Sequence, residues 1–173
     1  LDQPKQAKAE IGYLPEQPPL YKDMTVDEYL KYCARLHGIK RNEIPDSVEL
    51  AKKRCGLAET GRRLIGNLSK GFQQRIGIAQ AIIHSPKVII LDEPTVGLDP
   101  NQILEIRQLI VELGKDHGII LCTHILPEVE AVCNRVQIIN KGKFVYQARM
   151  EDLFEQRVTG LYEIKLLRPP TID

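Results

Sequence analysis

The most informative pattern of hydrophobic and polar positions is an apolar run at 88–91 that leads directly into Asp92 and Glu93. Four branched apolar residues without alternation are typical of a strand covered on both faces, as in a parallel sheet. Such a strand would deliver the two carboxylates to its carboxyl-terminal edge, where open α/β sheets bind ligands. A plain acidic turn at the surface is the alternative, and these residues alone do not separate the two interpretations.

Apolar periodicity and turn signals predict the remaining elements. Thr25 and Glu28 form a capping-box pattern at the start of a helix that Gly38 ends. Because strands alternate with helices, the chain is predicted to have an α/β layered fold with a mostly parallel sheet and a helical insertion. The predicted strands are 11–14, 88–91, 119–122 and a C-terminal β-hairpin of 136–139 with 143–146; the predicted helices are 25–37, 47–55, 73–84, 100–118, 127–133 and 151–156, with a connection at 41–45 and a strand-like run at 162–167.

Composition narrows the class of protein only slightly. The 173 residues are 43% hydrophobic and 27% charged with a net charge of +1, which gives no support for binding nucleic acid or membranes through bulk charge. No apolar run approaches the length of a membrane span. The first residue is Leu1 and not Met, so we expect an excerpt of a longer polypeptide. The cysteines, which include no CxxC pair, are predicted to be buried free thiols in a reducing cytosol: Cys33, Cys55, Cys122 and Cys133.

The order of short motifs is more specific than the composition. A loop with Glu16 and Gln17 comes first, followed by Leu-Ser-Lys-Gly-Phe at 68–72, the acidic strand end, Gly-Leu-Asp at 97–99, and His124 after a second strand. This order and spacing resemble the nucleotide-binding subunit of an ATP-binding cassette (ABC) transporter, over about residues 11–152. Among such subunits the chain looks closest to the bacterial exporter-like or multidrug-like group. The resemblance implies a P-loop NTPase core of which only part is present.

The resemblance assigns roles in ATP hydrolysis to three side chains. Asp92 would hold Mg²⁺, because a hard cation prefers carboxylate oxygens. Glu93 would polarise the attacking water, which is the positioning task in phosphoryl transfer. His124 resembles the histidine that contacts the γ-phosphate and the catalytic carboxylate. A turn carboxylate and a structural histidine are the simpler alternatives for Glu93 and His124.

Three further residues resemble the signature loop, which grips the γ-phosphate of ATP bound by an opposite subunit. Ser69, Lys70 and Gly71 would join a hydroxyl, a cation and a close backbone to a helix N-terminus, which makes an anion site. This role implies a head-to-tail dimer. Lys70 and Phe72 depart from the commonest Leu-Ser-Gly-Gly-Gln pattern. The simpler alternative for Ser69 is a helix cap, and for Asp99, which resembles a residue coupling the two sites, it is a helix N-cap that can coexist with coupling.

The loop after the first strand has two candidates for the metal-sensing residue of the family. Position favours Glu16 and residue type favours Gln17, and Glu16 would then assist Asp92 at the metal. Transmembrane permease partners usually dock at this loop and at the helical insertion. We therefore expect a cytoplasmic protein, peripheral on the inner face of the membrane, with a helical subdomain at about 24–84, a catalytic core half at about 86–150, and the start of a C-terminal extension at 151–173.

One essential motif of the resemblance does not occur in the sequence. The phosphate cradle Gly-x-x-x-x-Gly-Lys-Ser/Thr is missing, since the sequence contains no Gly-Lys-Ser/Thr. We therefore expect this chain alone neither to bind ATP tightly nor to hydrolyse it, although its parent would be an ATPase that energises transport. The rival hypotheses are a soluble ABC-type ATPase acting on ribosomes or nucleic acid and an inactive remnant that only binds partners. If the parent is the ATPase subunit of a transporter, no nucleic-acid partner is expected.

Overall fold

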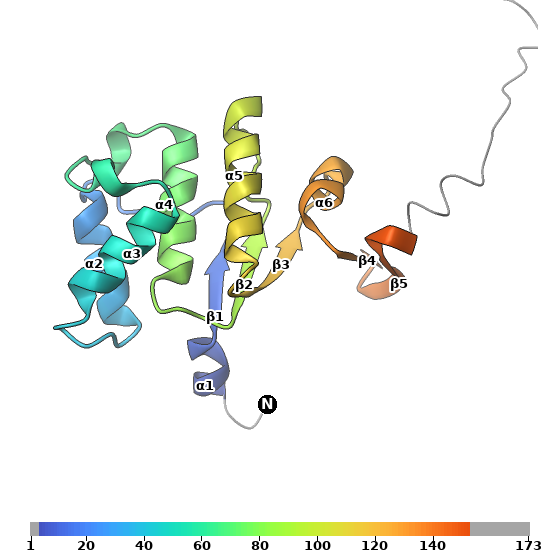
Figure 1. Cartoon of the computed structure of the whole chain (residues 1–173), viewed down its shortest axis with the longest axis horizontal. Coiled ribbons are helices and arrows are strands. Elements are labelled where there is room, and N and C mark those ends of the chain that lie inside the picture. Colours follow the sequence, from blue (N-terminus) through green and yellow to red (C-terminus); the bar gives the residue numbers. More distant parts are fainter. Residues whose placement is uncertain (1–3, 153–173) are drawn as a thin grey trace, which may run out of the picture. The chain divides into compact units, whose positions relative to one another are not determined.

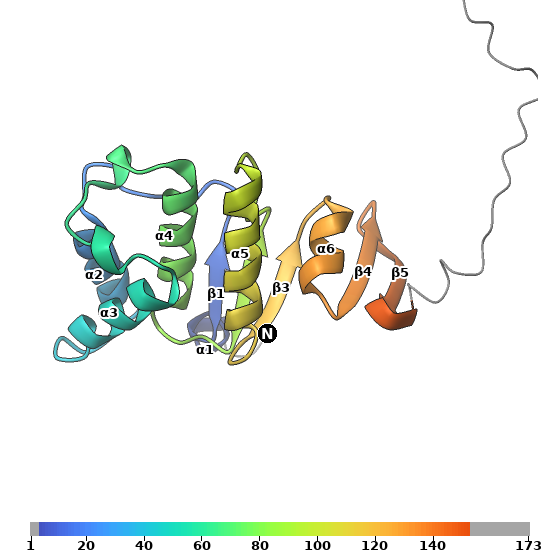
Figure 2. The same cartoon turned by 45° about the horizontal axis from the view of Figure 1, so that its top comes forward.

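The computed structural model describes residues 4–152 (Figures 1 and 2). The chain divides into two compact units, Leu1–Val132 and Cys133–Asp173. The predicted strand at 162–167 and most of the predicted helix at 151–156 lie outside the described residues. The elements are α1 (Pro4–Ala9), β1 (Ile11–Leu14), α2 (Val26–Leu36), α3 (Ile44–Arg54), the 3₁₀ turns η1 (Ala58–Thr60) and η2 (Ile65–Asn67), α4 (Lys70–Ile82), β2 (Val88–Asp92), α5 (Pro100–Leu113), β3 (Gly118–Cys122), α6 (Leu126–Val132), β4 (Arg135–Asn140) and β5 (Lys143–Arg149).

The first unit is built on a parallel sheet of β1, β2 and β3, in that order. The register aligns Leu14 with Leu91 and Leu91 with Leu121, so the carboxyl ends of the strands meet at one edge. The predicted α/β fold with a parallel sheet is therefore confirmed. Because β2 is the central strand, Asp92 and Glu93 emerge in the middle of that edge.

The two faces of this sheet differ, contrary to the prediction that β2 is covered on both. Leu14, Ile89 and Leu91 are fully buried on one face. On the other face Tyr13 is 49% exposed and Ile120 is 52% exposed. The reason is that α4 and α5 pack on the first face, whereas no helix among residues 4–132 covers the second (Figures 1 and 2). An unbroken apolar run thus marked a central strand without revealing that one side lacks a cover.

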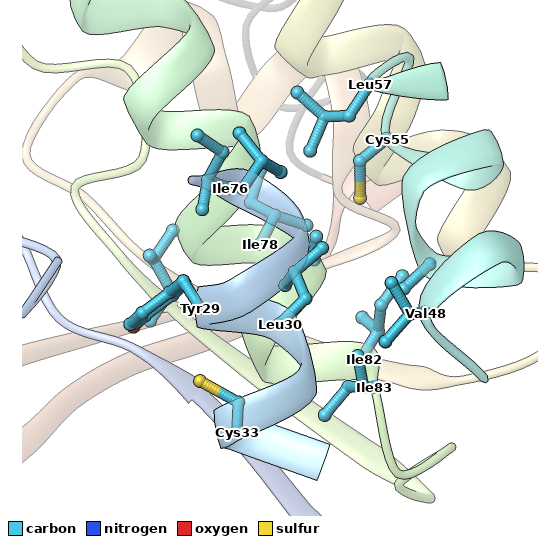
Figure 3. Close-up of a cluster of buried hydrophobic side chains, with 14 of the residues drawn as sticks. Tyr29, Leu30, Cys33, Val48, Cys55, Leu57, Ile76, Ile78, Ile82 and Ile83 are labelled. Atoms are coloured by element: carbon cyan, nitrogen blue, oxygen red, sulfur yellow. The ribbon is translucent and has the colours of Figure 1, made fainter. Parts of the chain in front are cut away.

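A helical layer extends away from the covered face. The helices α2 and α3 pack against α4 and bury one continuous apolar cluster (Figure 3). Ile76 and Ile78 of α4 are fully buried in that cluster beside Leu30 of α2. This arrangement follows from apolar stripes at helical spacing on each helix. Its labelled members are Tyr29, Leu30, Cys33, Val48, Cys55, Leu57, Ile76, Ile78, Ile82 and Ile83.

Local signals explain most helix boundaries, and some predicted boundaries were wrong. The capping box is confirmed, since Thr25 and Glu28 bond each other reciprocally at the start of α2. The helix α3 begins within the predicted connection because Pro45 occupies its first turn, where proline is compatible with helix. The helix α4 begins at Lys70, three residues early, because Ser69 caps it. The helix α5 stops at Leu113, well short of the predicted end, with Gly114 at its C-cap.

The described part of the second unit is the predicted antiparallel hairpin, which is confirmed. Its strands β4 and β5 are longer than predicted, and one register irregularity lies between Ile138 and Ile139. Lys141 and Gly142 have φ values of 49° and 74° at the turn. Positive φ at both central residues is the hallmark of a type I′ turn, which matches strand twist in two-residue hairpins. None of the helices described is long and apolar enough to cross a membrane.

Candidate active site

The candidate site starts at the carboxyl end of β2. Asp92 pairs with Cys122 in the parallel ladder, and the backbone N–H of Glu93 donates to the Cys122 carbonyl at 2.9 Å. The chain then turns sharply, because Glu93 has φ 46°, in the left-handed region that a glutamate rarely adopts. Such strain is typical of functional positions, where the surrounding structure must impose it.

The carboxylate of Glu93 is held by the segment that follows β3. The hydroxyl of Thr123 donates to Glu93 Oε2 at 3.0 Å, and the backbone N–H of His124 donates to Oε1 at 3.0 Å. His124 Nδ1 lies 2.6 Å from the same Oε1. The Glu93 side chain is only 17% exposed, whereas that of His124 is 76% exposed. The expected contact between Glu93 and His124 is therefore present, between a nearly buried carboxylate and an exposed imidazole.

This pairing shifts the pKa values of both groups. Burial alone would raise the pKa of Glu93, but hydrogen bonds from the His124 side chain, the Thr123 hydroxyl and the His124 backbone together lower it. The pKa of His124 is raised, mainly by its hydrogen bond to Glu93 and by the charge of that carboxylate. The pair therefore favours an ionised carboxylate beside a more readily protonated imidazole.

The loop after β1 carries both candidates for the metal-sensing residue. Glu16 and Gln17 are both exposed. The negative charge of Glu16 contributes to the raised pKa of His124, which places Glu16 within electrostatic reach of the imidazole. Glu16 is therefore electrostatically coupled to the site on the edge of the sheet, and the choice between the two residues stays a prediction.

The two partner-facing candidates are both helix caps. Ser69 Oγ accepts from the backbone N–H of Phe72 at 3.4 Å at the start of α4. Asp99 Oδ1 accepts from the backbone N–H groups of Asn101 and Gln102, each at 3.0 Å, at the start of α5. The simpler alternatives for Ser69 and Asp99 are thus both present. A cap aligns a helix N-terminus, so these contacts do not exclude binding of an anion or a partner at the same place.

These two helix starts pack closely against each other. A Cβ atom added to Gly71 would lie 2.7 Å from Cδ of the Gln102 side chain, so the absence of a side chain lets α4 approach α5. The Nζ atom of Lys70 lies against Gly97, whose φ of 71° requires a left-handed backbone. The signature-like loop and the Gly-Leu-Asp turn therefore form one surface next to the strand edge.

The donor set fits a magnesium ion only in part. Asp92 and Glu16 offer hard carboxylate oxygens, which Mg²⁺ prefers. No group of three or more His, Cys, Asp or Glu side chains that could hold a metal occurs within 4–152. Because Mg²⁺ usually keeps several waters and binds substrate phosphates through one or two carboxylates, a small protein donor set is compatible with it.

Sequence reasoning missed one residue of the site. Thr123 binds the second carboxylate oxygen of Glu93 and accepts from the backbone N–H of Ile125 at 3.1 Å. A hydroxyl at the end of a strand, directly before a candidate histidine, was the available signal. It was not used because threonine is common in strands for reasons of shape alone.

Comparisons with solved structures define the class of protein. The chain superposes with a TM-score of 0.79 and 31% identity on cbiO1 from Clostridium perfringens, described as part of the ABC transporter complex cbiONQ; the match covers 87% of this chain and 61% of that one. A second structure, titled as an ATP binding subunit of an ABC transporter, gives a TM-score of 0.73 at 29% identity over 91% of this chain and 66% of that one. The fold is that of ATP-binding subunits of this type.

Sequence comparisons give the family. The profile of the ABC transporter family matches residues 2–96, and the chain belongs to that family. The ABC transporter ATP-binding protein NatA of Bacillus subtilis is 39% identical over 90% of this chain and 64% of its own length. The uncharacterised relative YxlF of the same organism is 35% identical over 90% of this chain and 53% of its own length. The bacitracin transport ATP-binding protein BcrA of Bacillus licheniformis is 39% identical over 86% of this chain and 48% of its own length. The chain therefore spans about half to two thirds of the length of these relatives.

Proposed function

We propose that the protein to which this chain belongs binds and hydrolyses ATP and thereby energises transport through a separate membrane permease. The observation that carries the proposal is the Glu93 carboxylate, held between Thr123 and His124 at the strand edge. In phosphoryl transfer a protein mainly orients the nucleophile and stabilises charge. Here a nearly buried carboxylate that can orient the nucleophile lies beside an exposed imidazole that can stabilise charge.

The residue roles follow from the electrostatics of the pair. Glu93 has a lowered pKa, so it is ionised at neutral pH and accepts a hydrogen bond from a water in line with the γ-phosphate. His124 contributes positive charge, because its pKa is raised and its side chain is open to solvent. Nδ1 is used by Glu93, which leaves Nε2 as the ring atom to contact a phosphate oxygen.

Asp92 and Glu16 are the residues that would hold Mg²⁺ with the nucleotide. The bound cation would neutralise charge that develops on the β- and γ-phosphates. Asp92 is half-buried at the strand end and Glu16 is exposed on the neighbouring loop. Gln17 stays the alternative to Glu16 by residue type. The fit rests on the oxygen donors at the sheet edge, where α/β folds bind ligands.

We also propose a head-to-tail dimer with a second ATPase subunit. Ser69, Lys70 and Gly71 would face the γ-phosphate of the ATP on the opposite subunit, since a helix N-terminus and a cation together attract anions. Asp99 would couple the two sites from the adjoining surface. The packing of Lys70 against Gly97 supports a shared role for the two segments.

The partner in the membrane would be a transmembrane permease subunit, and the protein would lie on the cytoplasmic face of the membrane. Docking would involve the loop after β1 and the helices of the insertion, which would form the helical subdomain at 24–84. Two similar proteins support this, since one is named for bacitracin transport and the other is described as part of a transporter complex. No observation favours the alternative of a soluble ATPase acting on ribosomes or nucleic acid.

The test is steady-state ATP hydrolysis in a hybrid that places the N-terminal segment of NatA before this chain. We expect the hybrid to hydrolyse ATP with Mg²⁺, and Glu93→Gln to lower the rate by at least about 100-fold because the amide cannot accept a proton from water. The 173-residue chain alone should show no activity above its own Glu93→Gln variant, because it lacks the phosphate cradle.

A matched control distinguishes the site from general damage. Glu105→Gln changes an exposed carboxylate on α5, which pairs with Arg75, and should leave the hybrid's rate nearly unchanged. Equal rates for the hybrid and its Glu93→Gln variant would contradict the proposed role of Glu93. Hydrolysis by the unextended chain would contradict the predicted need for the cradle.

A further inference from the structure

The helix α6 carries a buried charge that the proposed mechanism does not use. Glu128 is 2% exposed and is the only buried acidic residue among 4–152. Its partner is Arg107 of α5, whose Nη2 donates to Glu128 Oε1 at 3.3 Å. The Nε atom of Arg107 is buried without a hydrogen-bond partner. A buried pair with an unsatisfied donor is weak evidence for a gain in stability, so its role is better sought in fixing an arrangement.

Hydrogen bonds and the short stretch of backbone that joins them connect this ion pair to the carboxylate of Glu93. The backbone N–H of Glu128 donates to the Ile125 carbonyl at 3.0 Å. The backbone N–H of Ile125 donates to Thr123 Oγ1 at 3.1 Å, and that hydroxyl donates to Glu93 Oε2 at 3.0 Å. The pair and the candidate site are therefore two ends of one short network.

The segment 123–125 is only partly held by packing, since Thr123 and Ile125 are half-buried and His124 is exposed. The His124 side chain is 76% exposed, so few apolar contacts fix its ring. On the amino-terminal side the segment is continuous with β3, an edge strand of the described sheet. On the carboxyl-terminal side it enters α6, which has seven residues and would be marginal without tertiary contacts.

We propose that Arg107 and Glu128 are positioning residues that dock α6 on α5 and so hold His124 against Glu93. The pair acts through the segment 123–125 and touches neither nucleotide nor water. Its catalytic consequence rests on the proposed function, but the geometry it maintains exists without nucleotide. Loss of either charge frees α6 to shift, which lengthens the contacts of His124 and Thr123 with Glu93.

The experiment measures that geometry in the 173-residue chain, without ATP. The readouts are the ¹⁵N chemical shifts of the His124 ring and the exchange rate of its backbone amide. Glu93→Gln defines the values for a weakened contact. In Glu128→Gln and in Arg107→Gln, we expect the ring shifts to move toward those of Glu93→Gln and the His124 amide to exchange at least tenfold faster.

Two further variants make the result specific. Asp27→Asn breaks a matched ion pair, since Asp27 Oδ1 lies 2.8 Å from Lys52 Nζ between α2 and α3, and it should leave the His124 signals unchanged. Arg107→Lys keeps the positive charge and should restore most of the wild-type ring shifts.

Wild-type His124 shifts and exchange in a folded Glu128→Gln or Arg107→Gln chain would overturn the proposal. If one of these variants unfolds, the His124 shifts and amide exchange of the other variant decide the test. If both unfold, the comparison of Arg107→Lys with wild type decides: ring shifts like those of wild type support the proposal, and a folded Arg107→Lys chain with ring shifts like those of Glu93→Gln overturns it. Since no readout involves hydrolysis, failure here is distinct from failure of the proposed ATPase.

Discussion

The two faces of the parallel sheet carry similar apolar residues but differ in how far these residues are buried. On the covered face, Ile89 and Leu91 are fully buried under α4 and α5. On the open face, residues of similar apolar character, such as Tyr13 and Ile120, are about half-exposed. Apolar side chains gain free energy only in proportion to the area removed from water, so equal residues contribute unequally on the two faces. The comparison teaches that the described residues cover one side of β2 completely and the other only partly, since Val88 and Ile90 are half-buried.

The largest expected effect is on the free energy of unfolding, when the same substitution is made on each face of the sheet. Ile89→Ala should lower the free energy of unfolding by about 3 kcal/mol, because it leaves a cavity in a packed layer. Ile120→Ala, with the same change in volume, should cost less than about 1 kcal/mol because the side chain is half in water. Urea denaturation followed by circular dichroism gives both values. Similar losses for the two variants would break the comparison.

A smaller expected effect is on the pH dependence of stability, through the contact between the helical layer and β1. His84 stacks on His37, with ring centroids 3.8 Å apart, and its Nε2 lies 3.3 Å from the Ile11 carbonyl. Burial, together with the charge of a protonated His37, lowers the pKa of His84 to about 4, from 6.5. The hydrogen bond with the Ile11 carbonyl, and then the charge of Glu10, act on this pKa in the opposite direction. The fold therefore favours the neutral imidazole.

The sign of the pH dependence follows from that shift. Above pH 6.5 both the folded and the unfolded chain carry neutral His84, and the stability is complete. Between pH 6.5 and about 4 the unfolded chain takes up the proton more readily, so stability falls. We expect the stability of wild type relative to His84→Phe to decrease from pH 7 to pH 4.5 in urea denaturation. A constant difference would contradict this assignment, since other acid-sensitive groups are common to both chains.

The smallest expected effect is a difference in the rate at which individual cysteines react with a thiol reagent. Cys33 and Cys55 are buried in the helical layer, whereas Cys122 is exposed at the end of β3. The prediction that the cysteines are buried was therefore wrong for Cys122, because it points to the open face. In the folded chain, mass spectrometry should find Cys122 modified by a thiol reagent long before Cys33 or Cys55.

The neighbours of Cys122 sharpen this prediction. Burial, and then the charges of Asp92 and Glu93, raise the pKa of the Cys122 thiol. Since the thiolate is the reactive form, Asp92→Asn should accelerate its modification severalfold at pH 8. A slower or unchanged reaction in Asp92→Asn would indicate that the carboxylate does not act on the thiol.

Much of the fold was predictable from local signals. The strand positions and the cap at Thr25 followed from apolar runs and from a side chain that satisfies backbone N–H groups. The start of α3 was missed because 41–45 was assigned to a connection, although proline is favoured in a first turn. The bare face of the sheet could not be predicted, because burial depends on which elements pack there and not on the strand itself.

One contact of the candidate site could be expected from the family resemblance, and the others could not. Glu93 and His124 were proposed as a pair, and the structure places them 2.6 Å apart. The contacts of Thr123 with Glu93 and of Arg107 with Glu128 depend on distances between elements remote in sequence, which no spacing encodes. The approach of Gln102 to Gly71 is likewise a tertiary contact, since 31 positions separate them. The roles of Glu16 and Gln17 depend on a nucleotide and stay predictions.

The left-handed backbone at Glu93 has a consequence for how this protein can decay. A glutamate at φ 46° carries a conformational cost that glycine or asparagine would largely avoid. Glycine or asparagine at this position would relieve the backbone cost but would lose the hydrogen bonds that Thr123 and His124 make to the carboxylate. In a lineage released from the need for this reaction, drift would be drawn toward glycine or asparagine at position 93. On the proposed function, glutamate is kept there for its chemistry in spite of the backbone cost.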